Sequence, residues 1–559
     1  MDVGIIASPY KLPESNSDAA SLHIGHMISI LKSECSIDKV EYADFTSAPH
    51  YLFSRLLRKL CENPKAIGLP DFLFNEELID LVKRFTLEEV FDVPAKRRTC
   101  NFFQVPESFV EGTTQILLKI AGKMVSTVSP SSKDAILIVS LYSDITYTLH
   151  LLRLVREEDP DVPVIVLDHY TFEPSTPYLE SFLTGKDYYG DNVGKPLEYD
   201  PLFPYLKTAI PEFIDWLVVG EGYDVLRTLF KSNALEKNYC LEGVSTAGKG
   251  TVHALTIDSR SSINRTGETN IIRSKPVDLD TLPFPDYSLI KGKYASGEIE
   301  FARGCPYSCI FCERSGLFGQ KVRWHSYEYI RELVDHLLSR YKFKFYTVLD
   351  PSVNMNEKLM VRYLQNLEKD GIYFPYQANL RGKRTTEELF RLLRNTGCKE
   401  IAVGLESGDN EVLKSMHKAE TVNVAKKLVR SIGENNMKSM LFLIMGFPTE
   451  RIESIRRSIE VLRSIQPRSS IDLILIEFYH AGHLQRLKPS VYDTYGIRWS
   501  DDLRIRNIKQ SSRIYAAPGL FGVADFTMGM RREELHMAAR AYIRSIKEMG
   551  LKCTINYNA

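Results

Sequence analysis

Three cysteines, Cys305, Cys309 and Cys312, stand in the segment Arg303-Gly-Cys-Pro-Tyr-Ser-Cys-Ile-Phe-Cys312, just after an apolar stretch typical of a strand. One short loop with these spacings can fold around one face of a cubane iron–sulfur cluster, which a full set of four thiolates would saturate. Three thiolates leave one metal position open, as in catalytic zinc sites. The open iron can chelate the amino and carboxylate groups of a methionine moiety. The triplet therefore predicts a 4Fe-4S cluster with one open iron.

Structural zinc is the alternative, with the same thiolates and a distant histidine such as His325. Zinc motifs usually come as two separated pairs of ligands, so the triplet favours the cluster. The remaining cysteines stand far apart, which indicates neither a disulfide framework nor an auxiliary cluster. These are Cys35, Cys61, Cys100, Cys240, Cys398 and Cys553. This usage is typical of a reducing compartment, and we expect a cytoplasmic protein.

The elements that must position the triplet form an α/β run at 298–481. Ser326 can cap one helix, Thr385 and Glu388 have capping-box spacing ahead of another, and Gly397 can end that one. The candidate strands are Glu298–Ala302, Phe345–Leu349, Tyr376–Leu380, Glu400–Leu405, Ser439–Met445 and Asp472–Phe478. Six such units predict a partial (βα)6 barrel, with its active site at the carboxyl ends of the strands. A helical C-terminal extension is expected at 482–559.

A separate α/β domain is expected at 1–237, with a helix-rich insertion at about 49–130. Its apolar runs predict an open, doubly wound, Rossmann-like sheet. They are Val3–Ala7, Val40–Tyr42, Ala135–Leu141, Val162–Leu167 and Ile214–Val219. Residues 238–297 are weakly patterned, and the three prolines of Lys275–Tyr287 indicate an extended linker.

The charge balance is neutral, with 71 Lys and Arg against 71 Asp and Glu. A neutral chain gives no electrostatic reason to expect nucleic acid as a partner. The N-terminus has no basic segment followed by an apolar one, and the most apolar runs are too short to span a membrane. We therefore expect neither a secretory signal nor a membrane span.

The triplet, with Phe311 just before its last cysteine, resembles the cluster loop of the radical S-adenosylmethionine (SAM) superfamily. Met445-Gly-Phe-Pro448 is similar to that family's fifth-strand turn. Gly404-Leu-Glu-Ser-Gly408 is similar to its fourth-strand segment, and the similarity continues through Glu411, Val412, Leu413, Met416 and Lys418. Gly319–Ser326 resembles the stretch that leads into the first barrel helix. The resemblance covers roughly Glu298–Ala481 and keeps the family's order.

By that resemblance, the reduced cluster splits bound SAM into methionine and a 5′-deoxyadenosyl radical. Phe311 would lie against the adenine, and Gly446 and Phe447 would let the backbone approach it. Glu406 and Ser407 would contact the ribose or the methionine end. Packing and turn formation are the ordinary alternatives for these residues.

Polar residues after two further strands are weaker candidates. Asp350 and Asn354 occupy the region that often holds the SAM amino group, although the family's usual Gly-Gly-Glu pattern is absent there. Arg381 could bind a carboxylate through its two parallel donors, or it could be an ordinary surface arginine.

The first domain resembles the cobalamin-binding domain that precedes the barrel in the B12-dependent radical SAM class. The segments that carry this resemblance are Ile138–Ser143, Asp161–Leu167, Asp215–Gly222 and Leu279–Pro285. Glycine and small hydroxyl residues let the backbone approach a large corrin closely. The candidate contacts are Ser140, Ser143, Thr146, Gly220 and Glu221.

Two departures from that class concern the same domain. Asp168-His169 replaces its usual paired glycines, and Tyr223 replaces an acidic residue after Gly-Glu-Gly. The Asp-x-His-x-x-Gly signature of histidine-ligated cobalamin is missing, so we expect cobalamin to bind without ligation by His169.

Taken together, the resemblance implies cobalamin-dependent C-methylation of an unactivated carbon. Radical cyclisation, ring contraction or rearrangement on the same fold, and a non-catalytic binding protein, remain alternatives. The substrate class stays open between small molecules, lipids and peptides, and an electron donor such as flavodoxin or ferredoxin is implied. Catalytic residues beyond the cofactor ligands are not assigned. His480 and His483 could contact substrate, but a solvated turn is the competing interpretation.

Overall fold

The structure is a computed structural model, and its elements form two compact units. The described residues of the first unit fall within 1–7 and 23–290, and those of the second within 19–22 and 296–556. The residues described are 1–7, 19–35, 37–44, 121–140, 145–168, 214–231, 235, 262–266, 269–274, 276–290, 296–309, 311–312, 318–341, 343–382, 385–447, 449–465, 469–475, 497–499, 524–526 and 532–556. Each unit is described by itself.

The first unit contains a seven-stranded sheet in the order β3-β1-β4-β5-β6-β8-β7. All neighbours pair in parallel except β7, which is antiparallel to β8. The strands are β1 (Asp2–Ala7), β3 (Lys39–Asp44), β4 (Ala135–Ser140), β5 (Val164–Asp168), β6 (Trp216–Val219), β7 (Ser262–Thr266) and β8 (Thr269–Arg273). Five of these correspond to the predicted strands.

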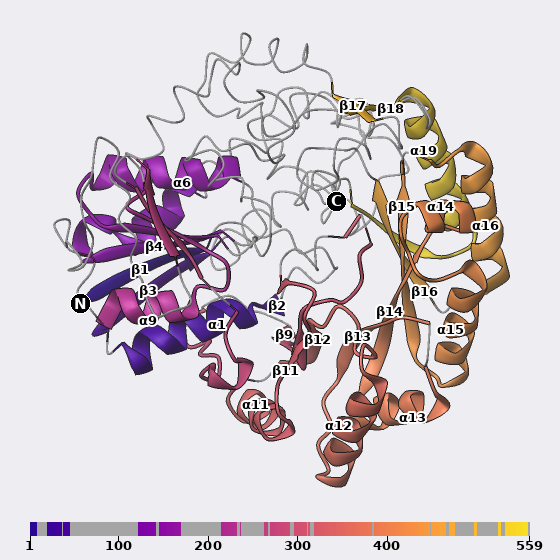
Figure 1. The fold of residues 1–559 in the computed structure, drawn as a ribbon, viewed down its shortest axis with the longest axis horizontal. Helices are drawn as coiled ribbons and strands as arrows, with labels where there is room; N and C mark the ends of the chain where they lie inside the picture. Colours follow the sequence, from indigo (N-terminus) through magenta and orange to yellow (C-terminus); the bar gives the residue numbers. More distant parts are fainter. Residues whose placement is uncertain are drawn as a thin grey trace, which may run out of the picture. The chain divides into compact units, whose positions relative to one another are not determined.

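Helices cover both faces of this sheet. Helix α6 (Ile145–Glu158) lies on one face, and α1 (Leu22–Ser29) and α9 (Tyr223–Lys231) lie on the other (Figure 1). Strand β4 is an unbroken apolar run whose residues 135–139 are fully buried, as expected for a parallel strand covered on both faces. The doubly wound prediction is confirmed. The strand order reverses between β1 and β4, which is where such sheets bind ligands at their carboxyl edge.

The predicted linker contributes to the first unit. Strands β7 and β8 fall within 238–297 and extend the sheet beyond β6. Residues 276–290 also pack on this unit: Lys32 donates to Asp286 at 2.7 Å, and a ring nitrogen of His26 lies 2.6 Å from the carbonyl of Pro283. Periodicity alone did not show these contacts, because they depend on partners far away in the sequence.

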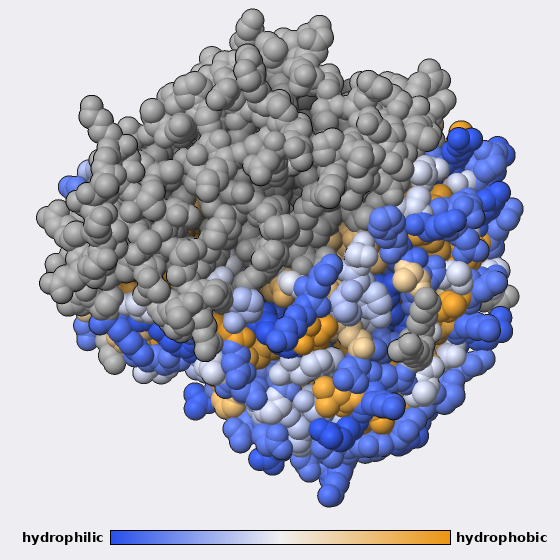
Figure 2. All heavy atoms as spheres, viewed as in Figure 1, coloured by the Kyte–Doolittle hydropathy of each residue, from blue (hydrophilic) through white to orange (hydrophobic). Residues whose placement is uncertain are grey.

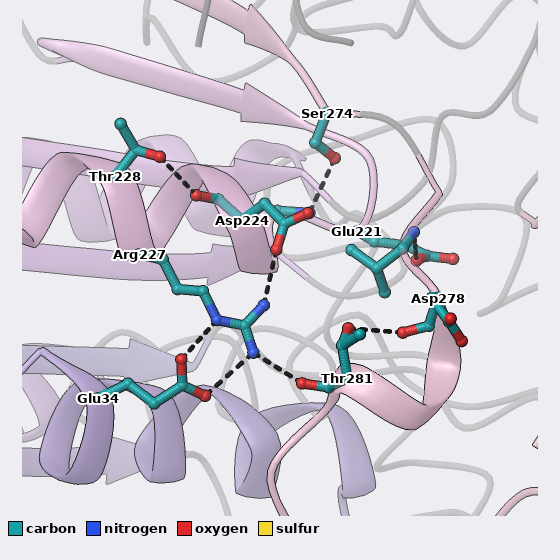
Figure 3. A network of polar contacts seen from close by, with 10 residues as sticks. Glu34, Glu221, Asp224, Arg227, Thr228, Ser274, Asp278 and Thr281 are labelled. Atoms are coloured by element: carbon teal, nitrogen blue, oxygen red, sulfur yellow. Dashed lines mark hydrogen bonds and ion pairs between the residues drawn. The ribbon is translucent and has the colours of Figure 1, made fainter. Parts of the chain in front are cut away.

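Arg227 holds this linker segment to the helices (Figure 3). Its guanidinium donates to Glu34 at 2.6 and 3.0 Å, to Asp224 at 2.6 Å and to the carbonyl of Thr281 at 3.0 Å. Glu34 ends the π-helical turn Ile30–Glu34 that continues α1. The linker is thus tied to two helices through one guanidinium.

The second unit contains an eight-stranded sheet in the order β19-β16-β15-β14-β13-β12-β9-β2, in which all neighbours are parallel. The strands are β2 (Ala19–Ala20), β9 (Ser296–Ile299), β12 (Phe345–Val348), β13 (Tyr376–Leu380), β14 (Cys398–Glu406), β15 (Lys438–Met445), β16 (Ser469–Leu475) and β19 (Lys552–Asn556). The six inner strands are the predicted ones. The sequence did not predict β2, and it predicted only helix after 482, where β19 adds a strand.

The helices of the second unit line one outer face of its curved sheet (Figure 1). They are α11 (Tyr327–Arg340), α12 (Glu357–Lys369), α13 (Glu387–Thr396), α14 (Asn410–Ser415), α15 (Val422–Glu434), α16 (Ile452–Ile465) and α19 (Arg532–Glu548). Strands β17 (Ile497–Trp499) and β18 (Ala524–Phe526) form a separate antiparallel pair. The repeated strand–helix order confirms the partial-barrel prediction.

Helix boundaries follow local chemistry. Ser326 caps α11 as predicted, since its hydroxyl accepts from the Tyr329 N–H at 3.2 Å. The cap of α13 is Thr386, one residue after the predicted Thr385. Gly397 ends α13 with φ +114°, and a Cβ there would lie 2.1 Å from the carbonyl oxygen of Phe374. No side chain fits at that position without moving the backbone.

The described surface is mostly hydrophilic on the face shown in Figure 2, with hydrophobic residues in small groups. Within the described residues, no helix combines the length and apolarity that crossing a bilayer requires.

Candidate active site

The cysteine loop lies a few residues after β9, at the carboxyl edge of the second sheet. It follows β10 (Ala302–Arg303), which pairs with β11 (Arg323–Trp324). Gly304 has φ +105°, and a Cβ there would lie 2.4 Å from the carbonyl oxygen of Lys321. The Cys305 N–H donates to the Gly319 carbonyl at 3.0 Å. Glycine is therefore required directly before the first cysteine.

The three thiols are not joined in disulfides. Cys305 and Cys309 are buried and Cys312 is half-buried, and the Cys312 N–H donates to the Cys309 carbonyl at 3.1 Å. Among the described residues, no three His, Cys, Asp or Glu side chains are gathered into a ready-made metal site. The donor set still fits an iron–sulfur cluster, because one loop supplies three soft ligands. The Arg381 guanidinium lies 3.7 Å from the Cys309 sulfur and donates to it.

His325, the histidine considered for zinc, contacts other groups. Its ring stacks on Tyr329 with 4.2 Å between centroids, and its Nε2 lies 3.6 Å from a carboxylate oxygen of Glu300. The backbone N–H of His325 donates to the Phe301 carbonyl at 2.9 Å. The residue thus fixes β11 and the strand end before the loop.

A buried ion pair lies directly before the loop. Arg303 donates from Nε to Glu300 at 3.0 Å, and a second bond joins Nη2 to the same carboxylate. Both side chains are buried, with exposed fractions of 5% for Arg303 and 4% for Glu300. Burial alone would raise the pKa of Glu300, but Arg303 and His325 hold it well below its usual range.

Asp350 follows β12 and is fully buried. Its Oδ1 accepts from the Phe301 N–H at 2.8 Å, and burial, with a smaller contribution from Glu300, raises the pKa of Asp350 to about 7. Within the described residues, Oδ2 has no hydrogen-bond partner. A buried carboxyl oxygen without a partner is costly unless a ligand supplies one.

Two residues of β13 and the turn after it share this property. Asn379, within β13, donates from Nδ2 to the Asp350 carbonyl at 2.9 Å, while its Oδ1 has no partner in the described part of the chain. Nη2 of Arg381 is likewise buried and unpaired there. Unsatisfied acceptors and an unsatisfied guanidinium donor at the ends of neighbouring strands suit a ligand that carries both a donor group and a carboxylate. Sequence reasoning missed Asn379, whose signal is a polar residue in an otherwise buried strand.

Asn354, predicted beside Asp350, has its amide occupied by the chain. Its Nδ2 donates to the Arg381 carbonyl at 2.7 Å and to Thr385 Oγ1 at 3.0 Å, and its Oδ1 accepts from the Arg381 N–H at 3.2 Å. This side chain fixes the backbone that carries Arg381. Its assignment to the SAM amino group stays a prediction.

Phe311 and Glu406 come together through Lys418, which the sequence places in the family-like fourth-strand segment without assigning it a contact. Lys418 Nζ donates to Glu406 Oε1 at 2.8 Å and lies 5.9 Å from the centre of the Phe311 ring. Both charged side chains are buried. Glu406 has φ +60°, and a Cβ at Gly404 would lie 2.3 Å from its carboxylate oxygen. A strained, buried carboxylate at a strand end is typical of a functional site.

Ser407 and the following turn are tied to α16. Ser407 is fully buried and its hydroxyl accepts from the Asp409 N–H at 3.2 Å. The Gly408 N–H donates to Ser458 at 2.8 Å, and Arg457 pairs with Asp409 at 2.8 Å. These bonds fix the turn after β14 against α16.

Glu450 fixes the turn after β15. Its Oε2 accepts from the Gly446 N–H at 2.7 Å, and its own N–H donates to the Phe447 carbonyl at 2.7 Å. Gly446 has φ +98° and Phe447 is buried. Burial raises the pKa of Glu450 to about 8. The two residues predicted near adenine thus lie in a turn that a largely neutral carboxyl group holds.

This pKa predicts a stability that depends on pH. Between about 4.3, the pKa of an unperturbed glutamate, and about 8, the folded chain keeps a proton that the unfolded chain has released. Stability should therefore fall as pH rises through this window. Glu450→Gln keeps an acceptor for Gly446 but cannot ionise. Urea midpoints at pH 5.5 and 8.5 should show the variant gaining stability over the parent at the higher pH.

The exposed Glu453, in the first turn of α16, supplies the control. Glu453→Gln should follow the parent at both pH values. If Glu450→Gln also followed the parent, the raised pKa would be wrong.

The first unit places its candidates at the carboxyl ends of its strands. Ser140 ends β4 and pairs in register with Asp168 at the end of β5. Thr146 lies in α6, and Gly220 follows β6 with φ +103°. Ser143 and His169 lie outside the described residues, as do His480 and His483.

Glu221 and Tyr223 turn toward the body of the first unit. Glu221 is fully buried and its Oε2 accepts from the Val277 N–H at 3.0 Å (Figure 3). The Tyr223 hydroxyl is hydrogen-bonded to the ring of His23, and His26 lies edge-on to the same tyrosine. Cobalamin contact by Gly220 and Glu221 stays a prediction, while Glu221 has a contact of its own with the linker.

Residues 299–462 match the radical SAM superfamily. An uncharacterized methyltransferase of Pyrococcus horikoshii is 24% identical over 369 residues, which cover 64% of this chain and 75% of that protein. The hopanoid C-2 methylase of Rhodopseudomonas palustris is 29% identical over 37% of this chain and 40% of its own. The anaerobic magnesium-protoporphyrin IX monomethyl ester cyclase of Rubrivivax gelatinosus is 21% identical over 48% of this chain and 47% of its own. The chain thus matches less than half the length of the last two.

A solved structure extends the similarity to both units. TsrM from Kitasatospora setae, a radical SAM methyltransferase whose structure holds cobalamin and a [4Fe-4S] cluster, aligns over 98% of this chain and 91% of its own. The TM-score is 0.57 and the identity 12%, a similarity of fold. The matched domain and the cysteine loop identify a radical SAM domain at residues 299–462 of this chain, and the solved structure shows that its fold is shared with that radical SAM methyltransferase.

Proposed function

We propose that this radical SAM enzyme is a cobalamin-dependent methyltransferase that methylates an unactivated carbon. The observation that carries the proposal is the carboxyl edge of the second sheet. This edge and the turns that follow it carry the cysteine loop and the Lys418–Glu406 pair. They also carry the atoms of Asp350, Asn379 and Arg381 that have no partner among the described residues. Methyl transfer is supported by relatives that are named methyltransferases.

In this proposal Cys305, Cys309 and Cys312 bind the 4Fe-4S cluster. The cluster, when bound, supplies the electron that splits SAM. Arg381 Nη2 is suited to the carboxylate of the methionine end of SAM. The buried oxygens of Asp350 and Asn379, which have no partner in the described part of the chain, are suited to its ammonium group.

The nucleoside half of SAM would lie toward β14 and β15. Phe311 would contact the adenine, with Gly446 and Phe447 giving it backbone access. Glu406 and Ser407 would bind the ribose or the methionine end. Lys418 donates to Glu406 at 2.8 Å and holds that side chain in place. All these side chains except Phe311 are largely withdrawn from water, which protects a reactive radical and fixes its distance from the substrate carbon.

Cobalamin would bind the first unit at the carboxyl edge, near the reversal of strand order between β1 and β4. Ser140, Ser143, Thr146, Gly220 and Glu221 are the proposed contacts, and His169 is not expected to ligate cobalt. A flavodoxin- or ferredoxin-type donor in the cytoplasm would deliver the electron.

Radical cyclisation is the second candidate. The similarity to an anaerobic magnesium-protoporphyrin ester cyclase favours it, because that relative is matched over almost half of this chain. A cyclase of this fold would use the same SAM site and leave the product without an added methyl group.

Composition of the purified protein tests the proposal. After anaerobic purification and reconstitution with iron, sulfide and hydroxocobalamin, we expect four irons and one cobalt per chain, with cobalamin absorption bands. Dithionite and SAM should then yield 5′-deoxyadenosine, and methyl-labelled SAM should label the cobalamin. A chain that makes 5′-deoxyadenosine but retains no cobalt would point to chemistry without methyl transfer. A chain that holds no iron would contradict the radical mechanism itself.

A further inference from the structure

Arg381 lies against the cysteine loop. Its guanidinium carbon is 3.7 Å from the centre of the Tyr307 ring, and its Nη1 is 3.7 Å from the Cys309 sulfur. Tyr307 lies between the first two cysteines of the loop. A planar guanidinium can stack on a ring and donate in its own plane at the same time, which an ammonium group cannot do.

The position of this guanidinium is fixed from several sides. Asn354 binds both the N–H and the carbonyl of Arg381, and the Thr385 hydroxyl donates to the same carbonyl at 2.9 Å. Glu420 lies 3.8 Å from Nε, with a side chain that is only 6% exposed. The side chain of Arg381 is itself 13% exposed. Its charge is therefore held beside one cysteine with little solvent to screen it.

We propose that Arg381 is a positioning residue that raises the reduction potential of the cluster by acting on the Cys309 sulfur. One-electron reduction adds a negative charge to the cluster and its thiolates. A hydrogen bond to a ligand sulfur and a fixed cation beside it stabilise the reduced form more than the oxidised form. The electron comes from an external one-electron donor of low potential.

Glu420 carries the charge opposite to that of Arg381 and allows a second test. Its carboxylate lies 3.8 Å from Nε of the same guanidinium and offsets part of its field. Removing the carboxylate should make Arg381 more effective, whereas removing the guanidinium should abolish the effect. Simple damage to the loop would not shift the potential in two directions.

The inference rests on the proposed cluster ligation, and the two can fail separately. Wild-type protein that takes up no iron would remove the proposed function. An intact cluster whose potential does not change in the Arg381 variants would overturn this inference and leave the proposed function standing.

The test uses the full chain, reconstituted anaerobically and titrated with dithionite while the reduced cluster is followed by electron paramagnetic resonance. In Arg381→Met the reduction equilibrium should become at least tenfold less favourable, which for a one-electron couple is about 59 mV. Arg381→Lys keeps the positive charge but loses the planar group that stacks on Tyr307. Its reduction potential should therefore lie between those of the wild type and Arg381→Met. Glu420→Gln should shift the potential upward.

Arg391 is the matched control, because it lies exposed on α13 and pairs with Glu368 at 3.0 Å. Arg391→Met should leave the potential unchanged. An unchanged potential in Arg381→Met with four irons bound would overturn the inference. If the Arg381 variants bind fewer irons, the potential of Glu420→Gln becomes the test. A Glu420→Gln potential equal to that of the wild type would then contradict the proposal.

Discussion

Alanine in place of Cys305, Cys309 or Cys312 is expected to abolish both the iron–sulfur cluster and the cleavage of SAM. The loop offers three thiols and one iron must stay open, so a missing thiolate leaves two irons without protein ligands. Iron per chain, the absorption of the reconstituted cluster and 5′-deoxyadenosine after reduction measure the effect. We expect production of 5′-deoxyadenosine to fall to the background without enzyme.

Cys398 provides the control for this experiment. It lies in β14, and burial raises the pKa of its thiol well above the ordinary range, so it is poorly suited to bind metal. Cys398→Ala should therefore keep its iron and its SAM cleavage. Full 5′-deoxyadenosine production in any variant of the triplet would refute the assignment of the cluster.

Loss of Glu300 is expected to destabilise the second unit strongly. Alanine at this position would leave the buried guanidinium of Arg303 without its carboxylate. Breaking a buried ion pair by removing one partner costs about 3–5 kcal/mol. Urea unfolding should show a lower midpoint, and the cluster should be lost sooner, because Arg303 stands directly before the loop glycine.

Replacing both partners separates charge from packing. Glu300→Leu combined with Arg303→Met removes both charges while keeping apolar volume, and such replacements are often tolerated. The double variant should regain much of the stability lost in Glu300→Ala. A double variant as unstable as the single one would show that the contacts of Glu300 with His325, rather than the ion pair, hold this region.

The sequence predicted those parts of the second unit that local pattern determines. The strands from Phe345 to Met445 are apolar runs bounded by turn residues, and their predicted bounds lie within two residues of those observed. Cys305 and its loop could be recognised because cluster ligation requires fixed spacings. The cap at Thr386 was misplaced by one residue because its neighbour Thr385 is also a good capping residue.

Features that depend on distant partners could not be predicted. Strands β7, β8 and β19 are short, and only their pairing with β6 and β16 makes them strands. Asn379 is a single polar residue whose importance comes from what the fold places beside it, and Lys418 could be assigned to a family-like segment but not to its partner Glu406. The same holds for Glu221, which a motif could suggest as a cofactor contact but whose bond to Val277 depends on the course of the linker.

The attachment of residues 276–290 to the first unit determines where this protein can be divided for biochemistry. A fragment ending at 237 would lack β7 and β8 and expose the edge of β6, whose residues Trp216–Val219 are apolar and prone to pair with other chains. It would also leave the Arg227 guanidinium without the Thr281 carbonyl. A fragment meant for cobalamin-binding measurements on the first unit should therefore extend to Ile290.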